Sequence, residues 1–243
     1  MQELVLSGNP KIITLEDGEE IQTKGVIIAT GATPRKLGVP GEKEFTGKGV
    51  SYCATCDADF FDDFEVFVVG GGNTAVEEGV YLAKFARKVT IVVRRDVLRC
   101  DAIVKAEAEE TEKVEFMYNT SIKEIKGEGL VQSVVLVNNV TGEESEYFAD
   151  EDDGLMGVFV FVGTDPVSGL FEGQIDMTDN KNIITNELMQ TNIPLVYAIG
   201  DVRNTPLRQV VTAASDGAIA AVSIEKELKT LKKRRVISSD RIR

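Results

Sequence analysis

The sequence predicts an α/β protein made of two similar domains, and three observations support this prediction. Between residues 65 and 93, a strand, a glycine turn, a helix and a second strand follow one another, which is the order of a βαβ unit with a parallel sheet. Residues 194–201 form another apolar run that stops at glycine and aspartate before a long helix. The chain has 243 residues, which is enough for two domains of ordinary size.

The composition is that of a soluble globular protein, with 43% hydrophobic and 28% charged residues. The net charge of −13 repels phosphate backbones, so we expect no nucleic-acid partner. No apolar run is long enough to cross a bilayer, and the first residues lack a signal-peptide pattern, so we expect no membrane partner and a cytoplasmic location. The basic residues from Lys232 to Arg235, with Arg241 and Arg243, are interpreted as a solvated tail.

The first 49 residues predict short strands and a connector. Residues 4–6 and 12–15 alternate with turn residues and indicate an antiparallel ribbon. Residues 26–32 form an apolar strand that ends in small residues, among them Thr30 and Gly31, where a ligand can approach the backbone closely. Residues 33–49 contain two prolines and several glycines without a sustained period, which indicates a connector between domains.

The rest of the chain alternates between strand and helix patterns. Runs of β-branched residues predict strands, and apolar residues spaced three or four apart predict helices. We expect strands at 65–69, 89–93, 114–116, 121–125, 131–137, 144–148, 157–163 and 194–201, helices at 74–85, 102–112 and 211–231, and an exposed acidic loop at 150–153.

The glycine turn of the βαβ unit has a fingerprint for dinucleotides. Gly70, Gly72 and Ala75 fit the pattern Gly-x-Gly-x-x-Gly/Ala, and Asn73 and Thr74 lie within it. Such a turn brings backbone amides close to a pyrophosphate, which then lies at the positive end of the following helix. The pattern stands between a strand and a helix, which is the context that supports this interpretation.

The end of the second strand indicates which dinucleotide is bound. An acidic residue there would bind the ribose hydroxyl of NAD, but the strand is followed by Arg94 and Arg95, with Arg99 shortly after. Guanidinium groups favour a 2′-phosphate through charge-assisted hydrogen bonds. The sequence therefore predicts NADPH, and the alternative is an incidental basic patch on a dinucleotide-binding unit.

Two of the three cysteines form a CxxC motif, Cys53 and Cys56, which has the spacing of a redox-active dithiol. Asp57 follows directly and is a candidate proton carrier while the disulfide opens. A zinc site is the competing interpretation, but the chain has no histidine and only Cys100 remains as a further sulfur ligand, so we expect no metal. Cys100 is interpreted as an incidental thiol.

Together these motifs resemble the bacterial-type, low-molecular-weight thioredoxin reductases. The resemblance rests on CATCD at 53–57, GGGNTAVEE at 70–78 and RRD at 94–96 with Arg99, and it continues through 29–32, 200–201 and 208–209. It implies a homodimeric flavoprotein that passes electrons from NADPH to FAD, then to the Cys53–Cys56 disulfide, and then to thioredoxin or a similar small disulfide protein.

The resemblance also implies roles for individual residues. Cys53 would attack the thioredoxin disulfide, Cys56 would face the flavin, and Asp57 would be the acid. The residues implied on the flavin side are Thr30, Gly31, Gly200, Asp201, Arg208, Gln209 and Val210.

The expected architecture is two Rossmann-like domains, the second inserted into the first. Residues 1–36 and 158–243 would form the FAD domain, and residues 37–157 the NADPH and dithiol domain. The family's first strand–glycine–helix unit does not precede Met1, so we expect a truncated FAD domain. Two alternatives remain: an NADPH-binding module without flavin or catalysis, and a related flavin reductase that serves another protein disulfide.

Overall fold

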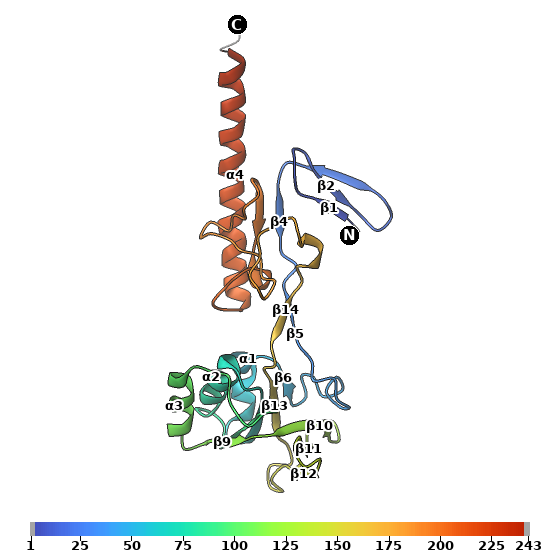
Figure 1. Ribbon diagram of the computed structural model, residues 1–243, viewed down its shortest axis with the longest axis vertical. Coiled ribbons are helices and arrows are strands. Elements are labelled where there is room, and N and C mark those ends of the chain that lie inside the picture. The colour runs from blue at the N-terminus through green and yellow to red at the C-terminus, as the bar shows by residue number, and fades with distance from the viewer. Residues whose placement is uncertain (1–2, 241–243) are drawn as a thin grey trace. The chain divides into compact units, whose positions relative to one another are not determined.

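The computed structural model describes residues 3–240, with side chains up to Lys232, and it divides into two compact units (Figure 1). Unit 1 comprises Met1–Thr33 and Thr164–Arg243, and unit 2 comprises Pro34–Gly163. Unit 2 is therefore an insertion within unit 1. The strands at the two crossing points, β5 (Ala32–Pro34) and β14 (Thr164–Pro166), pair with each other.

Unit 2 is built on a five-stranded sheet in the order β6-β13-β7-β8-β9, in which every pairing is parallel. The predicted βαβ unit is confirmed, because β7 pairs with β8 in parallel register from Glu65 opposite Lys88 to Val69 opposite Val92. Both strands are rich in β-branched residues and are buried on both faces, as strands of a parallel sheet covered on both sides should be. The strands are β6 (Val50–Ser51), β7 (Glu65–Val69), β8 (Lys88–Val92), β9 (Val114–Met117) and β13 (Gly157–Val160).

Side chains alternate between the two faces of this sheet and form two separate cores. Val66 and Val68 of β7 belong to one core, whereas Phe67 and Val69 belong to the other. The first core is covered by α1, α2 and α3, of which α2 and α3 lie side by side (Figure 1). These helices and the short 3₁₀ helix after α1 are α1 (Ala54–Asp57), η1 (Ala58–Phe61), α2 (Asn73–Leu82) and α3 (Ala102–Glu110).

The second core is covered by a three-stranded antiparallel sheet in the order β10-β11-β12. The predicted hairpin is confirmed, because β11 pairs with β12 in antiparallel register across the turn at residues 139–143. Apolar residues of β10 and β11, including Ile122, Ile125 and Leu136, face the parallel sheet. The strands are β10 (Thr120–Lys126), β11 (Ser133–Asn138) and β12 (Glu144–Phe148).

Unit 1 contains an antiparallel ribbon, a parallel pair of strands and a long helix. The ribbon has the order β1-β2-β3, one strand more than the sequence predicted. In the parallel pair, Val26–Ile28 of β4 lies beside Val196–Ala198 of β15. The other elements are β1 (Glu3–Val5), β2 (Lys11–Thr14), β3 (Glu20–Thr23), η2 (Gly169–Phe171), η3 (Gly200–Val202) and α4 (Val210–Asp240).

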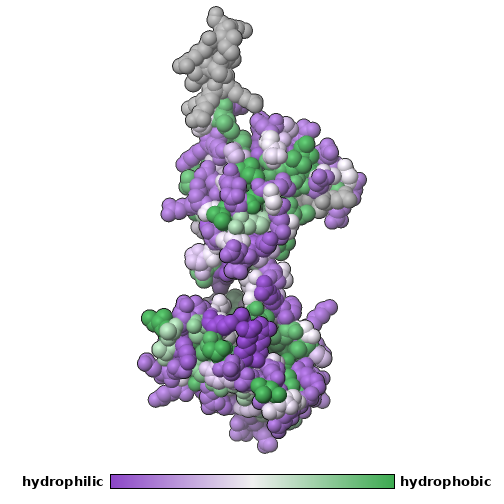
Figure 2. Space-filling view, in the orientation of Figure 1, coloured by the Kyte–Doolittle hydropathy of each residue, from purple (hydrophilic) through white to green (hydrophobic). Residues whose placement is uncertain are grey.

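Helix α4 is longer than the predicted range of 211–231 and runs to Asp240. The basic run that starts at Lys232 continues this helix, and its side chains after Lys232 lie outside the described residues. Within the described part of the chain, no helix is long and apolar enough to span a membrane. Hydrophilic residues predominate on the visible face of each unit, with smaller hydrophobic patches between them (Figure 2).

Candidate functional site

The glycine turn joins the end of β7 to the first turn of α2. Gly70 has φ of 153°, and a Cβ there would lie 2.5 Å from the carbonyl oxygen of Phe161, so only glycine fits. Gly72 differs, because its φ of −97° is ordinary and nothing lies within 4 Å of where its Cβ would be. No side chain caps the first turn of α2. The turn therefore presents open space in front of helix amides that lack a side-chain acceptor, and this fits a pyrophosphate.

Three arginines lie on the loop after β8. Arg94, Arg95 and Arg99 are exposed, and none of their side chains has a hydrogen-bond or ion-pair partner among the described side chains. The backbone of the loop is held in place, since the carbonyl of Arg94 accepts a bond of 2.9 Å from the Asn139 amide and that of Arg95 accepts one of 2.9 Å from the N–H of Asn119. Unpaired guanidinium groups in a protein of net charge −13 fit an anionic ligand.

The turn and the arginine loop are adjacent in the fold. The backbone N–H of Arg99 donates a bond of 2.6 Å to the carbonyl of Gly71. The residues of unit 2 thus fit a dinucleotide with a 2′-phosphate, whose pyrophosphate would meet residues 70–75 and whose 2′-phosphate would meet the arginines. Ala75 is buried and supports the turn through packing, whereas Thr74 is exposed beside it.

The two cysteines of the CxxC motif form a disulfide between the end of β6 and α1. Cys53 precedes the first residue of α1 and Cys56 lies within the helix, with their Cα atoms 5.3 Å apart. Ala54 of this helix is buried in the same core as Ala75 and Val76 of α2, so the disulfide and the glycine turn belong to elements that share one core. Across the described residues, no group of three or more His, Cys, Asp or Glu side chains lies close enough to hold a metal.

Asp57 is held by a buried serine beside the disulfide. The hydroxyl of Ser51, which is 5% exposed, donates a bond of 2.6 Å to Oδ2 of Asp57 and accepts one of 3.1 Å from the N–H of Cys53. Ser51 therefore connects the carboxylate to the backbone of the first cysteine. Sequence reasoning missed this residue, because a serine in a two-residue strand carries no signal of its contacts.

Tyr52, next to Cys53, is hydrogen-bonded to Glu42. Its hydroxyl donates a bond of 2.8 Å to Oε1 of Glu42, and Nζ of Lys36 lies 4.0 Å from the centre of its ring. Burial, followed by the hydrogen bond to Glu42 and its charge, raises the pKa of Tyr52 to about 12. The phenol therefore stays protonated at neutral pH.

Cys100 and Glu78 of unit 2 also have shifted pKa values. Burial raises the pKa of the Cys100 thiol, so it remains protonated and unreactive at neutral pH, in agreement with its interpretation as an incidental thiol. On α2, Oε2 of Glu78 is buried and has no hydrogen-bond partner in the described structure. Burial, and then the charge of Glu77, raises the pKa of Glu78.

The residues implied on the flavin side lie in unit 1. Parallel pairing of β4 with β15 brings Thr30 and Gly31 to the same edge as Gly200 and Asp201. Gly31 and Gly200 have φ of 73° and 67°, so both loops turn in a conformation that favours glycine. This edge has the geometry that open α/β sheets offer to ligands, and the residues present fit the flavin end of FAD.

The first turn of α4 lies close to the same edge, because α4 contacts η3. The N–H of Gly200 donates a bond of 3.0 Å to Oδ2 of Asp216, which also accepts a bond of 3.2 Å from Arg203. Val210 is 87% exposed at the start of α4, next to Arg208 and Gln209. The structure thus brings the predicted residues of unit 1 to one end of the unit, and sequence reasoning missed Asp216, which fixes the loop from inside the helix.

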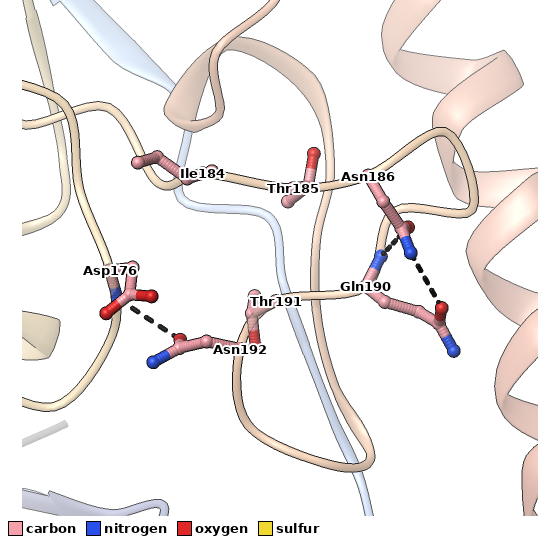
Figure 3. A pocket seen from close by; sticks show the side chains of 7 residues that line it. All are labelled: Asp176, Ile184, Thr185, Asn186, Gln190, Thr191 and Asn192. Atoms are coloured by element: carbon pink, nitrogen blue, oxygen red, sulfur yellow. Dashed lines mark hydrogen bonds between the residues drawn. The ribbon is translucent and has the colours of Figure 1, made fainter.

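A pocket elsewhere in unit 1 contains none of the predicted residues. It lies among the irregular segments between η2 and β15 (Figure 3). The backbone N–H of Asp176 donates to Oδ1 of Asn192, and Nδ2 of Asn186 donates to Oε1 of Gln190. These two bonds fix part of the wall of the pocket.

Comparison with known proteins finds thioredoxin reductases among the proteins that this chain is similar to. The family model described as pyridine nucleotide-disulphide oxidoreductase matches residues 3–217. A thioredoxin reductase of Peptoclostridium acidaminophilum is 59% identical over 221 residues, which cover 91% of this chain and 70% of that relative. A thioredoxin reductase of Bacillus subtilis (strain 168) is 48% identical over 236 residues, covering 94% of this chain and 73% of that relative.

Solved structures give the same result. The crystal structure of thioredoxin reductase from Streptococcus pyogenes MGAS5005 matches with a TM-score of 0.86 and 43% identity, covering 94% of this chain and 73% of that chain. The thioredoxin reductase from Giardia duodenalis matches with a TM-score of 0.86 and 36% identity, covering 93% of this chain and 73% of that chain. Sequence and structure thus point to the same group of proteins, and the chain is similar to them along almost its whole length.

Proposed function

The chain belongs to the pyridine nucleotide-disulphide oxidoreductase family and, within it, to the thioredoxin reductases. On that basis we propose that its residues carry electrons from NADPH through FAD to the Cys53–Cys56 disulfide and on to thioredoxin. The observation that supports this route most directly is the formed disulfide on α1, whose core is shared with the glycine-turn helix α2. When bound, the nicotinamide supplies a hydride and the flavin passes the electron pair towards sulfur.

We assign the binding of NADPH to unit 2. Backbone amides at the start of α2 hold the pyrophosphate, and the open space in front of Gly72 lets it approach. Arg94, Arg95 and Arg99 hold the 2′-phosphate through charge-assisted bonds, which selects NADPH over NADH. The unpaired state of the three guanidinium groups among the described side chains supports this assignment.

We assign the flavin-facing role to unit 1. Thr30, Gly31, Gly200 and Asp201 supply the polar edge at the carboxyl ends of β4 and β15, and the start of α4 lies beside it. This second group comprises Arg208, Gln209 and Val210. The exposure of Val210, 87%, supports a role in covering an apolar ring.

The disulfide accepts two electrons and two protons and opens to two thiols. Cys53 passes its proton to Asp57, and its thiolate attacks the disulfide of thioredoxin, which forms a mixed disulfide and releases one thioredoxin thiolate. Asp57, which Ser51 holds beside the dithiol, returns this proton to the leaving thiolate. Cys56 then loses its proton and attacks Cys53, and the second thioredoxin sulfur leaves and takes up that proton, which releases reduced thioredoxin and restores the Cys53–Cys56 disulfide.

We further propose that the protein acts as a homodimer in the cytoplasm. The apolar side chain of Val211, which is 73% exposed in the first turn of α4, supports burial against another surface. A catalytic disulfide that must be reduced in each cycle fits a reducing compartment. Sedimentation of the purified protein measures the first point directly.

The decisive experiment follows NADPH oxidation by the FAD-loaded protein with thioredoxin as acceptor. Cys53→Ser and Cys56→Ser should each abolish turnover, and Cys100→Ser is the matched control that should keep it. Incubation with thioredoxin should trap a mixed disulfide on Cys53 of the Cys56→Ser variant and none on the Cys53→Ser variant. Turnover that survives either serine substitution contradicts the proposal, and a trapped complex on the wrong cysteine reverses the two roles.

A further inference from the structure

The arginine loop, residues 93–101, is attached to the rest of unit 2 at both ends. Its beginning is held by two bonds: the carbonyl of Arg94 accepts one from Asn139 in the turn of the β-hairpin, and that of Arg95 accepts one from Asn119 in the turn before β10. Its end is held against the glycine turn, through the bond from the N–H of Arg99 to the carbonyl of Gly71. The side chain of Leu98 is also buried in the core that contains α2, and a further attachment ties the end of the loop to the first residue of α2.

That further attachment is a reciprocal pair of hydrogen bonds between Asn73 and Asp101. Nδ2 of Asn73 donates a bond of 2.8 Å to Oδ2 of Asp101, and the N–H of Asp101 donates a bond of 2.8 Å to Oδ1 of Asn73. Asn73 is the first residue of α2 and Asp101 is the residue before α3. The pair therefore joins the starts of two helices that are 28 residues apart in the chain.

An asparagine is well suited to this position because one amide offers a donor and an acceptor in fixed geometry. Its carbonyl takes the N–H of Asp101 while its NH₂ group meets the carboxylate of the same residue. Both functional atoms of Asn73 are thus used within the protein. Asp101 stands where a helix cap is expected, but its carboxylate makes no capping bond within α3 and binds Asn73 instead.

We propose that the Asn73–Asp101 pair is a positioning pair that fixes the distance between the arginine loop and the glycine turn and thereby sets the preference for a 2′-phosphorylated dinucleotide. This inference rests on the proposed function. The pyrophosphate and the 2′-phosphate of one nucleotide are separated by a ribose, so both can be held well only if turn and arginines keep one spacing. Without the pair, Arg99 keeps its charge but loses its fixed place relative to Gly72.

The test is equilibrium binding of NADP⁺ and of NAD⁺ to the full chain by titration calorimetry. Asp101→Ala removes the acceptor for Asn73 without touching the glycine turn, and Asp101→Asn keeps an oxygen in the same place. Asp101→Ala removes one hydrogen bond to a charged group and leaves the backbone bond, so it should weaken NADP⁺ binding about tenfold, while NAD⁺ affinity changes by less than about twofold. Asp101→Asn should restore most of the NADP⁺ affinity.

A readout without nucleotide is hydrogen exchange at the amide of Arg99, which should become faster in Asp101→Ala and remain slow in Asp101→Asn. If Asp101→Ala does not fold, Asn73→Ala removes both bonds and leaves the start of α3 unchanged. An unchanged ratio of NADP⁺ to NAD⁺ affinity in the alanine variants overturns the inference. Failure of the unaltered chain to bind NADP⁺ contradicts the proposed nucleotide site itself, which is a different outcome.

Discussion

Replacing Gly72 by alanine should separate nucleotide binding from stability in this fold. Gly72 has φ of −97° and ψ of 177°, which alanine adopts without strain. Nothing in the protein lies within 4 Å of the added Cβ. The methyl group therefore has room in the protein alone, and the space that it takes is the space proposed for the pyrophosphate.

The expected magnitudes follow from this geometry. Alanine restricts the unfolded chain, which stabilises the fold by about 0.4–1 kcal/mol, but it is a poorer residue than glycine before a helix, which costs a similar amount. The free energy of unfolding should thus change by less than about 1 kcal/mol. A phosphate oxygen displaced by the methyl loses a hydrogen bond to a charged group, worth roughly 1.5–3 kcal/mol, so NADP⁺ affinity should fall by about 10- to 100-fold.

Calorimetric titration with NADP⁺ and a denaturant melt of the same samples measure both quantities, and Gly70→Ala is the contrasting control. A Cβ at Gly70 would lie 2.5 Å from the backbone oxygen of Phe161 and from Cβ of Ala75, so this variant should lose at least about 2 kcal/mol of stability. Wild-type NADP⁺ affinity in the Gly72→Ala variant refutes the placement of the pyrophosphate. A strongly destabilised Gly72→Ala variant refutes the structural reasoning.

Two further predictions concern Ser51 and Glu78. Ser51→Ala removes the hydrogen bond to Asp57 and should slow thioredoxin reduction about tenfold while the KM for NADPH stays the same. Steady-state kinetics with both substrates varied measure this. If the serine were only structural, the kinetic constants for NADPH and for thioredoxin would change equally. Glu78→Gln should raise the free energy of unfolding at pH 7–8 by about 1 kcal/mol, and the melting temperature with it. The reason is that burial raises the pKa of this carboxyl and so disfavours its charged form. The stabilising contribution of protonated Glu78 is complete below its ordinary pKa of 4.5 and is lost as the pH rises through the raised pKa. The difference in stability between the unaltered protein and Glu78→Gln should therefore disappear in acid. A gain in stability that is independent of pH would contradict this cause.

Elements with strong local patterns could be predicted from the sequence. The run Glu65–Val69 is apolar, β-branched and followed by glycine, and it forms a strand over those same residues. Helix α1 could not be found in this way, because four residues are too few to show a helical period and its position comes from Ala54 packing into a core made by distant segments. The third strand of the ribbon was missed for a related reason, since Glu20–Thr23 is mostly exposed and its place comes from pairing with β2.

Some residues of the candidate site could likewise be predicted from the sequence, and others could not. Residues proposed to touch the ligands belong to motifs of contiguous residues, such as the glycine turn, and the sequence could predict them because backbone chemistry at that spacing suffices. Residues that hold those motifs in place come from other parts of the chain: Asp101 bonds to Asn73 of the glycine turn, and Asp216 accepts a bond from the N–H of Gly200. In both units, then, a polar side chain at or within a helix fixes a loop at the end of a parallel strand. Because that bond depends on how helix and strand pack, the proposed role of the Asn73–Asp101 pair implies that specificity depends partly on residues outside the motifs, such as Asp101, and substitutions there should alter ligand preference while the motifs remain intact.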